Sequence, residues 1–494
     1  MSSFDASFAA VEYFFKSGVY PWFFAILNCL FAFIASAHAI IYKREPRAAA
    51  LWVVVIWLVP FIGSLLYLLF GINRIKRKAA LILGELEHYR ACPHKIGLSP
   101  TELQEYLPHN SRHLAVLAKL ASKVVVRPLE SGNSIELLDC GDEAYPVMLD
   151  HIRKAKKSIS LCTYIFDCDK IGMEFANALA EAVKNGVQVR VLVDTAGEKY
   201  SWPRITRILK KLGVTCSLFN TTTRIPGFFS INLRNHKKIM VVDGVTGFTG
   251  GMNIRDGNLL SKNPPYPVRD LHFRVTGPVV GQLQEAFVDD WYFTTGETLR
   301  GEIWFPEIKD TGSSFARGIT DGPDEDFEKL RLIILGALAC AQRSIKIMTP
   351  YFLPDSSIIS SLNIAALKGV DVDIILPDKN NLPFVKWASV AMLWQVLEKG
   401  CRVWLSKPPF DHSKLLIVDD CWTLIGSANW DSRSLRLNFE FCLEIYDPKF
   451  ACIASQVFES RKSISRLITL AEVDARPLPI RFRDGVAKLF APYL

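Results

Sequence analysis

A His-x-Lys-x4-Asp motif that occurs twice constrains the fold more than any other feature of the sequence. The first copy, with the asparagine that follows seventeen residues after its histidine, is His236, Lys238, Asp243 and Asn253. The second copy has the same spacing and consists of His412, Lys414, Asp419 and Asn429. One such motif has little specificity. Two copies in the same register, each with a Gly-Gly or Gly-Ser turn before its asparagine, indicate an internal duplication.

The elements predicted around each motif are repeated as well. In each half, an apolar strand, a helix that ends near a glycine and a second strand precede the motif. They are predicted at residues 158–166, 173–184 and 187–194 in the first half, and at 344–352, 357–368 and 370–377 in the second. Each motif then runs from a loop into an apolar strand, in which alternate residues point to the same face. We therefore predict two homologous α/β halves that each present a histidine and a lysine to one pocket.

Two apolar stretches without charged residues precede these halves, at 19–42 and 48–71. Each is longer than the roughly twenty residues that a helix needs to cross a bilayer. The short polar segment 43–47 separates them. We therefore predict a transmembrane helical hairpin and a multi-pass membrane protein.

The charges near these stretches predict the orientation of the hairpin. The basic cluster at 74–78 outweighs the three basic residues between the two stretches, so the positive-inside rule places the following domains in the cytoplasm. The eleven cysteines show no C-x-x-C spacing, which disfavours a zinc site and suits a reducing compartment. Asp5 and Glu12 near the start of the chain do not fit a cleaved signal peptide.

Composition and the repeat together predict the domain boundaries. The segments are a membrane hairpin (1–78), a connector (79–135), the first half (136–305), a linker (306–325), the second half (326–470) and a C-terminal stretch (471–494). The C-terminal stretch interleaves aromatic, aliphatic and basic residues, and is either an interfacial amphipathic helix or a helix docked on the domain. A loop before His236, with Phe228 and Phe229 near its tip, is either a contact for acyl chains or an ordinary packed loop.

The residues of the two motifs suit phosphodiester chemistry without a metal ion. No Asp-x-Asp or His-x-His pattern accompanies them, so we expect neither a metal nor another cofactor. Two lysines and two asparagines are instead able to stabilise the charge on a transferring phosphoryl group. One histidine would attack phosphorus while the other acts as general acid and base, so the two should have opposite charge states near neutral pH.

A carboxylate behind each histidine would hold its ring tautomer. The candidates are Glu440, eleven residues after Asn429, and Asp270, seventeen residues after Asn253. Ser427, in the Gly-Ser turn of the second copy, is a further candidate for a supporting role.

The segments HKKIMVVDGVTGFTGGMN and HSKLLIVDDCWTLIGSANWD resemble the paired motifs of the phospholipase D superfamily. The apolar segment LWVVVIWLVPFIGSLLYLLFG is similar to the N-terminal membrane segment of bacterial cardiolipin synthases. Residues 269–293 and the segments TPYFLPD and SRSLRLNFEF also resemble other parts of that family. The resemblance implies mixed sheets flanked by helices and one active site at the interface of the two halves.

The resemblance also implies roles for the motif residues. His236 would be the nucleophile and His412 the general acid and base. The phosphate would be held by Lys238, Lys414, Asn253 and Asn429. Asp243 and Asp419, which belong to the catalytic motifs, would support the site structurally.

The superfamily contains hydrolases, nucleases and phosphatidyltransferases, so the motifs alone do not select a reaction. The membrane hairpin favours a cardiolipin synthase of the bacterial plasma membrane, in which one phosphatidylglycerol transfers its phosphatidyl group to a second through a covalent phosphatidyl-histidine. The alternative is a membrane phospholipase D that hydrolyses phospholipids to phosphatidic acid. Other anionic phospholipids, and phosphatidylethanolamine as donor or acceptor, stay open. A nucleic-acid partner is not expected, because no stripe of aromatic and basic residues suited to single strands is present.

Overall fold

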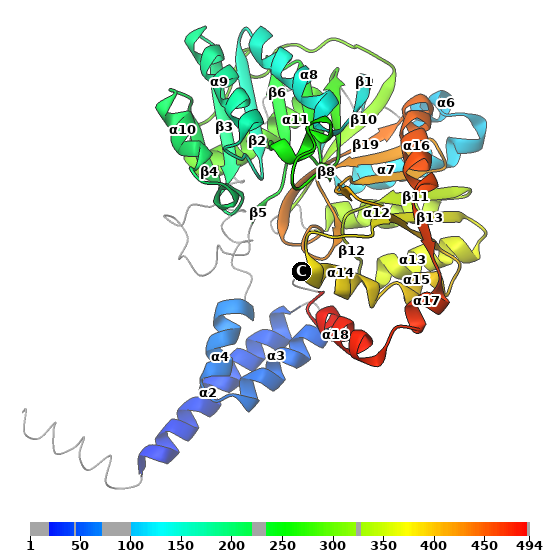
Figure 1. Cartoon of the computed structure of the whole chain (residues 1–494). Coiled ribbons are helices and arrows are strands. Elements are labelled where there is room, and N and C mark those ends of the chain that lie inside the picture. Colours follow the sequence, from blue (N-terminus) through cyan, green and yellow to red (C-terminus); the bar gives the residue numbers. More distant parts are fainter. Residues whose placement is uncertain (1–18, 44–45, 72–99, 220–233, 323–327, 492–494) are drawn as a thin grey trace, which may run out of the picture. The chain divides into compact units, whose positions relative to one another are not determined.

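The computed structural model describes residues 19–43, 46–71, 100–219, 234–322 and 328–491 (Figure 1). The described chain forms two compact units: an N-terminal unit within residues 1–78, and an α/β unit that contains both motifs. The basic cluster at 74–78 and the loop with Phe228 and Phe229 lie outside the described residues.

The N-terminal unit contains one long apolar helix. Helix α2 (Val19–Tyr42) has 24 residues and is about 36 Å long at roughly 1.5 Å per residue, which is enough to cross a bilayer. Among the described helices, α2 alone is long and apolar enough to do so. The chain then folds back along α2, where Trp57 Nε1 donates a hydrogen bond to Ser36 Oγ at 3.1 Å.

Composition predicts one continuous helix for the second apolar stretch, but the structure shows an interrupted one. It is divided into α3 (Pro46–Leu58), α4 (Ile62–Leu66) and a π-helix, η1 (Tyr67–Gly71). The break falls at Pro60, which has no N–H to donate, and at Phe61, whose φ of 57° is left-handed. The Phe61 N–H instead donates to Asn28 Oδ1 of α2 at 2.7 Å.

The two halves of the α/β unit share one mixed sheet with a nearly symmetric strand order. From one edge to the other the order is β20-β14-β13-β11-β16-β17-β19-β10-β1-β9-β7-β6-β2-β3-β4. The pairs β2–β3–β4 and β11–β13–β14 are parallel, and the central pairs are antiparallel. The first-half strands are β1 (Glu130–Asp139), β2 (Ser158–Thr163), β3 (Gln188–Asp194), β4 (Cys216–Phe219), β6 (Ile239–Val242), β7 (Thr246–Gly250) and β9 (Leu271–Thr276). The second-half strands are β10 (Ser314–Asp321), β11 (Ser344–Met348), β13 (Asp371–Pro377), β14 (Arg402–Ser406), β16 (Leu415–Val418), β17 (Trp422–Gly426), β19 (Asn438–Tyr446) and β20 (Arg466–Ile468).

Helices flank this sheet in each half (Figure 1). In the first half they are α8 (Cys140–Lys154), α9 (Lys170–Lys184), α10 (Ile205–Lys211) and α11 (Val280–Thr295). In the second half they are α12 (Lys329–Cys340), α13 (Ser356–Leu367), α14 (Pro383–Val390), α15 (Trp394–Leu397), α16 (Pro448–Ser463), α17 (Leu470–Asp474) and α18 (Leu478–Leu489). Each half has its own apolar core, and α7 (Ala115–Val124) of the connector joins the core of the second half. The prediction of a mixed α/β fold is confirmed.

The prediction of a linker at 306–325 is wrong, because this segment contains β10, a central strand of the sheet. Strand β10 is buried along its whole length and pairs with β1 and β19, so it joins the two halves. Its sequence, SFARGITD, contains charged residues, which are more typical of a loop than of a buried strand. The structure neutralises one of these charges, since the fully buried Arg317 forms an ion pair with Glu444 at 2.5 Å.

Candidate active site

Each motif begins in a segment that crosses from one half to the other. Strand β5 (Arg234–Asn235) ends just before His236 and pairs with residues 438–439 of β19, which belongs to the second half. Strand β15 (Phe410–Asp411) ends just before His412 and pairs with β8 (Val268–Arg269) of the first half. The backbone of each histidine is therefore held by the opposite half.

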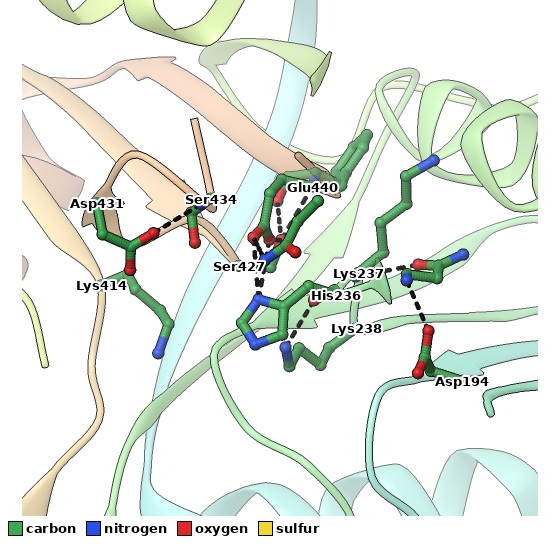
Figure 2. A network of polar contacts seen from close by, with 12 residues as sticks. Asp194, His236, Lys237, Lys238, Lys414, Ser427, Asp431, Ser434 and Glu440 are labelled. Atoms are coloured by element: carbon green, nitrogen blue, oxygen red, sulfur yellow. Dashed lines mark hydrogen bonds and ion pairs between the residues drawn. The ribbon is translucent and has the colours of Figure 1, made fainter. Parts of the chain in front are cut away.

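The side chain of each histidine likewise contacts a carboxylate of the opposite half. His236 Nδ1 lies 3.0 Å from a carboxylate oxygen of Glu440, and His412 Nδ1 lies 2.7 Å from one of Asp270. Figure 2 shows the His236 ring directed at Glu440. A hydrogen bond from Nδ1–H to a carboxylate leaves Nε2 with its lone pair available for chemistry.

Glu440 has more polar support than Asp270. The Ser427 hydroxyl donates to Glu440 at 2.5 Å and the Asn438 amide at 3.1 Å. Gly251 occupies the position of Ser427 in the first half, and a Cβ there would lie 2.3 Å from an oxygen of Asp270. The first half therefore needs a glycine at this position, whereas the second half has Ser427 there, which donates a hydrogen bond to Glu440.

Both motif lysines are buried beside the histidines. Lys238 Nζ donates to the His236 carbonyl oxygen at 2.6 Å, and Lys414 Nζ donates to the His412 carbonyl oxygen. Burial lowers the pKa of Lys238 to about 7 and that of Lys414 to about 8, although Glu440 and Asp270 oppose this change. A bound phosphate would favour the charged form of both lysines.

The carboxylates differ in their pKa. Burial alone would raise the pKa of Glu440, but the adjacent His236 ring holds it below its ordinary value. Burial raises the pKa of Asp270 to about 6. Glu440 is therefore the more firmly ionised of the two at neutral pH.

Both histidines have a pKa below the ordinary value. Burial lowers the pKa of His236, with partial compensation from Glu440. Burial and then the Lys414 ammonium hold the pKa of His412 well below its ordinary range. The protein groups alone therefore favour two neutral imidazoles and do not produce the predicted opposite charge states. A phosphodiester anion next to both rings would raise both pKa values.

The two motif asparagines are buried but differ in their contacts. Asn253 Oδ1 accepts a hydrogen bond from the Ile165 N–H at 3.0 Å, which leaves its NH₂ group for another partner. Asn429 Oδ1 is buried and has no hydrogen-bond partner among the described residues.

The motif aspartates Asp243 and Asp419, for which a structural supporting role is expected, do not lie at the histidines. Each follows the core strand that its lysine precedes, so it lies about 16 Å from that lysine at roughly 3.3 Å per residue. Asp243 accepts hydrogen bonds from the backbone N–H groups of residues 156–158, and Asp419 from those of residues 342–344. Both have a left-handed φ, of 52° and 55°. They fix the turns that precede β2 and β11.

A buried network behind His236 was not predicted from the sequence. Lys237, between the motif histidine and lysine, forms an ion pair with Asp290 of α11 at 2.9 Å. Asn235 donates to the same carboxylate at 2.7 Å, and its own N–H donates to Asp194 at 2.8 Å. Figure 2 shows Lys237 next to the histidine and Asp194 farther from the ring. The network holds the segment that crosses to the second half.

Two tyrosines that the sequence analysis did not select contact the histidine rings. Tyr164 lies edge-on to His236 with ring centres 5.1 Å apart, and Tyr351 lies edge-on to His412 at 6.2 Å. They follow the carboxyl ends of β2 and β11, where the repeated segments TYIF and TPYF offered a signal. Asp431 is also buried here, and burial raises its pKa to about 6.

The described residues contain no group of three or more His, Cys, Asp or Glu side chains that would hold a metal ion. Lys238 and Lys414 are the positive groups that the motifs themselves place beside the histidines. The residues of the two motifs therefore comprise two imidazoles, two lysine amines and two side-chain amides, the groups that phosphodiester chemistry without a metal ion needs.

Comparison with protein families gives two matches. The family described as the phospholipase D-like domain of cardiolipin synthase matches residues 148–291 and 334–462, one segment in each half. The family described as the phospholipase D-nuclease N-terminal segment matches residues 22–71.

Individual proteins similar to this chain include several curated cardiolipin synthases. The major cardiolipin synthase of Bacillus subtilis is 33% identical over 95% of this chain and 98% of its own length. The cardiolipin synthase of Geobacillus kaustophilus is 32% identical over 96% of this chain and 94% of its own. Among solved structures, phosphatidylserine synthase of Haemophilus influenzae superposes with a TM-score of 0.61 at 19% identity, over 77% of this chain and all of its own, which supports the fold.

Proposed function

The chain belongs to the bacterial cardiolipin synthases of the phospholipase D superfamily and is a phosphatidyltransferase of this type, and from this premise we propose that both of its substrates are phosphatidylglycerol. The phosphatidyl group of one molecule passes to a headgroup hydroxyl of the other, which yields cardiolipin and free glycerol. The observation that supports this chemistry is the crossed pair of histidines and carboxylates around two buried lysines.

In the first step, His236 Nε2 attacks the phosphorus of the donor. The bond between phosphorus and the glycerol oxygen breaks, and protonated His412 gives its Nε2 proton to that oxygen. The product is a phosphatidyl-histidine. Glu440 supports this assignment, because its lowered pKa keeps it ionised and able to hold the attacking tautomer.

In the second step, neutral His412 takes the proton of a headgroup hydroxyl on the second phosphatidylglycerol. That oxygen attacks phosphorus, and the bond between phosphorus and His236 breaks. Lys238, Lys414, Asn253 and Asn429 hold the phosphate oxygens in both steps. Asp270, whose pKa is raised to about 6, suits a histidine that changes its proton twice in each cycle.

The reaction is tested by incubating the purified full-length protein with phosphatidylglycerol in mixed micelles that contain a metal chelator. We expect cardiolipin and glycerol in equal amounts, measured by mass spectrometry. Phosphatidic acid and glycerol without cardiolipin would show that water is the acceptor and that the protein acts as a phospholipase D. Isotope-labelled phosphatidylethanolamine, added in competition, measures whether the donor and acceptor sites accept a second headgroup.

The chain is a membrane protein of this family, and we propose that it crosses the bilayer as a hairpin. The hydrogen bonds from Trp57 and Phe61 to residues of α2 support this arrangement, because they tie the interrupted second stretch to the first. The α/β unit would then face the cytoplasm, in agreement with the basic cluster at 74–78. Protease digestion of sealed inverted and right-side-out vesicles tests it: digestion of the α/β unit only in the inverted vesicles is expected.

A further inference from the structure

The C-terminal helix α18 is docked on the α/β unit, next to α14. Ala487 joins a small apolar core with Val385 and Ala388 of α14 and with Leu353. The Arg483 guanidinium lies over the Trp387 ring, 4.3 Å from its centre. The helix is therefore anchored to the protein on one side.

The other side of α18 is apolar and exposed. Leu478, Phe482 and Leu489 are exposed by 77%, 73% and 75%, although each is large and hydrophobic. Their spacing of four and seven residues places them on one face of the helix. Val486 and Phe490 lie beside them and are partly exposed. Soluble surfaces rarely keep such residues in one patch, so a contiguous patch of this kind marks an interaction surface.

Basic residues border this face. Arg481 and Lys488 are seven residues apart and follow one edge, while Arg483 lies at the opposite edge. The single acidic residue of the helix, Asp484, is buried and forms ion pairs with Arg476 and Arg483. An apolar face with a cationic edge formed by Arg481 and Lys488 fits the boundary between the headgroups and acyl chains of an anionic bilayer.

The patch continues onto α14 and adjoins the active site. Phe490 packs against Phe384, with ring centres 5.7 Å apart, and the neighbouring Leu382 is exposed by 46%. On its inner side, the core between the two helices contacts Tyr351. The Tyr351 ring in turn lies against His412. The small core and then the Tyr351 ring therefore lie between the patch and His412.

We propose that the exposed face of α18, extended by Leu382 and Phe384, is the surface with which the α/β unit docks on an anionic bilayer. Docking there brings headgroups to the wall of the active site that contains Tyr351 and His412 while the acyl chains stay in the membrane. The proposal adds a second membrane contact to that of α2, and its activity test rests on the proposed function.

The first experiment is independent of turnover. The full-length protein with Phe482 replaced by the photo-crosslinking residue p-benzoylphenylalanine is placed in nanodiscs that contain phosphatidylglycerol and is irradiated. We expect an adduct with the mass of a phospholipid. The same residue at position 116, on α7, provides the matched control, because Val116 is similarly exposed at 59%. Equal lipid labelling at both positions, or none at 482, would overturn the proposal.

The second experiment compares two forms of one substrate. The double variant Phe482→Ser/Leu489→Ser should lose about tenfold or more of its activity on bilayer phosphatidylglycerol and keep its activity on monomeric dihexanoyl phosphatidylglycerol within about twofold, because only the first depends on docking. Val116→Ser/Ile453→Ser, which removes two exposed apolar residues elsewhere, is the control. An equal loss on both substrates would assign α18 a purely structural role, and no loss on either would exclude docking.

A wild-type protein that converts neither substrate would contradict the proposed function and leave the crosslinking result to decide on docking. The electrostatic part is tested with Arg481→Gln/Lys488→Gln. Its activity on vesicles should fall most when the fraction of phosphatidylglycerol is low, and unchanged activity at every fraction would remove the basic edge from the proposal.

Discussion

The two halves of the α/β unit present the same motif with different polar support. In one, His236 pairs with a glutamate that Ser427 and Asn438 also bind. In the other, His412 pairs with an aspartate that lies against Gly251. The duplicated backbone thus creates two equivalent histidine positions, while the side chains around them create two different environments. A symmetric fold is able to assign asymmetric roles in this way.

The largest expected effect separates the two histidines. His236→Asn should lower turnover by roughly 10⁴-fold or more, because no nucleophile remains. His412→Asn should lose about 10²- to 10⁴-fold, the usual contribution of a general acid and base. Intact-protein mass spectrometry after addition of phosphatidylglycerol provides the test: a phosphatidyl adduct should accumulate on the His412 variant and not on the His236 variant. An adduct on His412 in the His236 variant would reverse the two roles.

Replacing Glu440, the partner of His236, should lower activity more than replacing Asp270, the partner of His412. We expect Glu440→Gln to lower kcat/KM by about 100-fold and Asp270→Asn by about tenfold, because Glu440 is the more firmly ionised and fixes the attacking tautomer. Since the pKa of Asp270 is about 6, the wild-type kcat/KM should fall as the pH drops below 6 and Asp270 becomes protonated. This acid limb should be absent in Asp270→Asn. Equal losses in both variants, with unchanged pH profiles, would argue against distinct roles.

The lysines should shape the alkaline limb of the same profile. Their charged forms bind phosphate, so kcat/KM should decline as the pH rises through about 7 for Lys238 and about 8 for Lys414. Arginine stays protonated over this range. Lys238→Arg should therefore delay the decline to about pH 8, while Lys414→Arg should leave its onset near pH 7. Profiles measured between pH 6 and 9.5 decide this, and identical onsets in both variants would contradict the ordering.

The smallest effect concerns the motif aspartates. Asp419 accepts a hydrogen bond from His113 Nε2 at 2.8 Å in addition to its backbone partners, and no ring donates to Asp243 among the described residues. His113→Gln should lower the free energy of unfolding by about 1 kcal/mol with normal kcat, since the backbone bonds remain. Thermal unfolding in detergent measures this change. A large fall in kcat at normal stability would show that the geometry of this turn affects the catalytic residues directly.

Much of the architecture could be predicted from local patterns. Apolar strands and helices recur around both motifs, because burial imposes a period that is visible along the chain. Strand β10 was missed since the charge of Arg317 is neutralised by Glu444, which is 127 residues away in the sequence. The break at Pro60 and Phe61 was missed because composition alone resembled one continuous span.

The sequence by itself determined the reacting groups: two histidines, two lysines and two asparagines in one repeated register, with Glu440 and Asp270 as candidate partners. Only the tertiary structure decided that the carboxylates are exchanged between the halves, that Asp243 and Asp419 hold turns instead of substrate, and that Tyr164 and Tyr351 line the histidines. The physical reason is the range of each interaction. Spacing along the chain records which residues share a strand, whereas a hydrogen bond across 204 residues depends on how the two halves pack together.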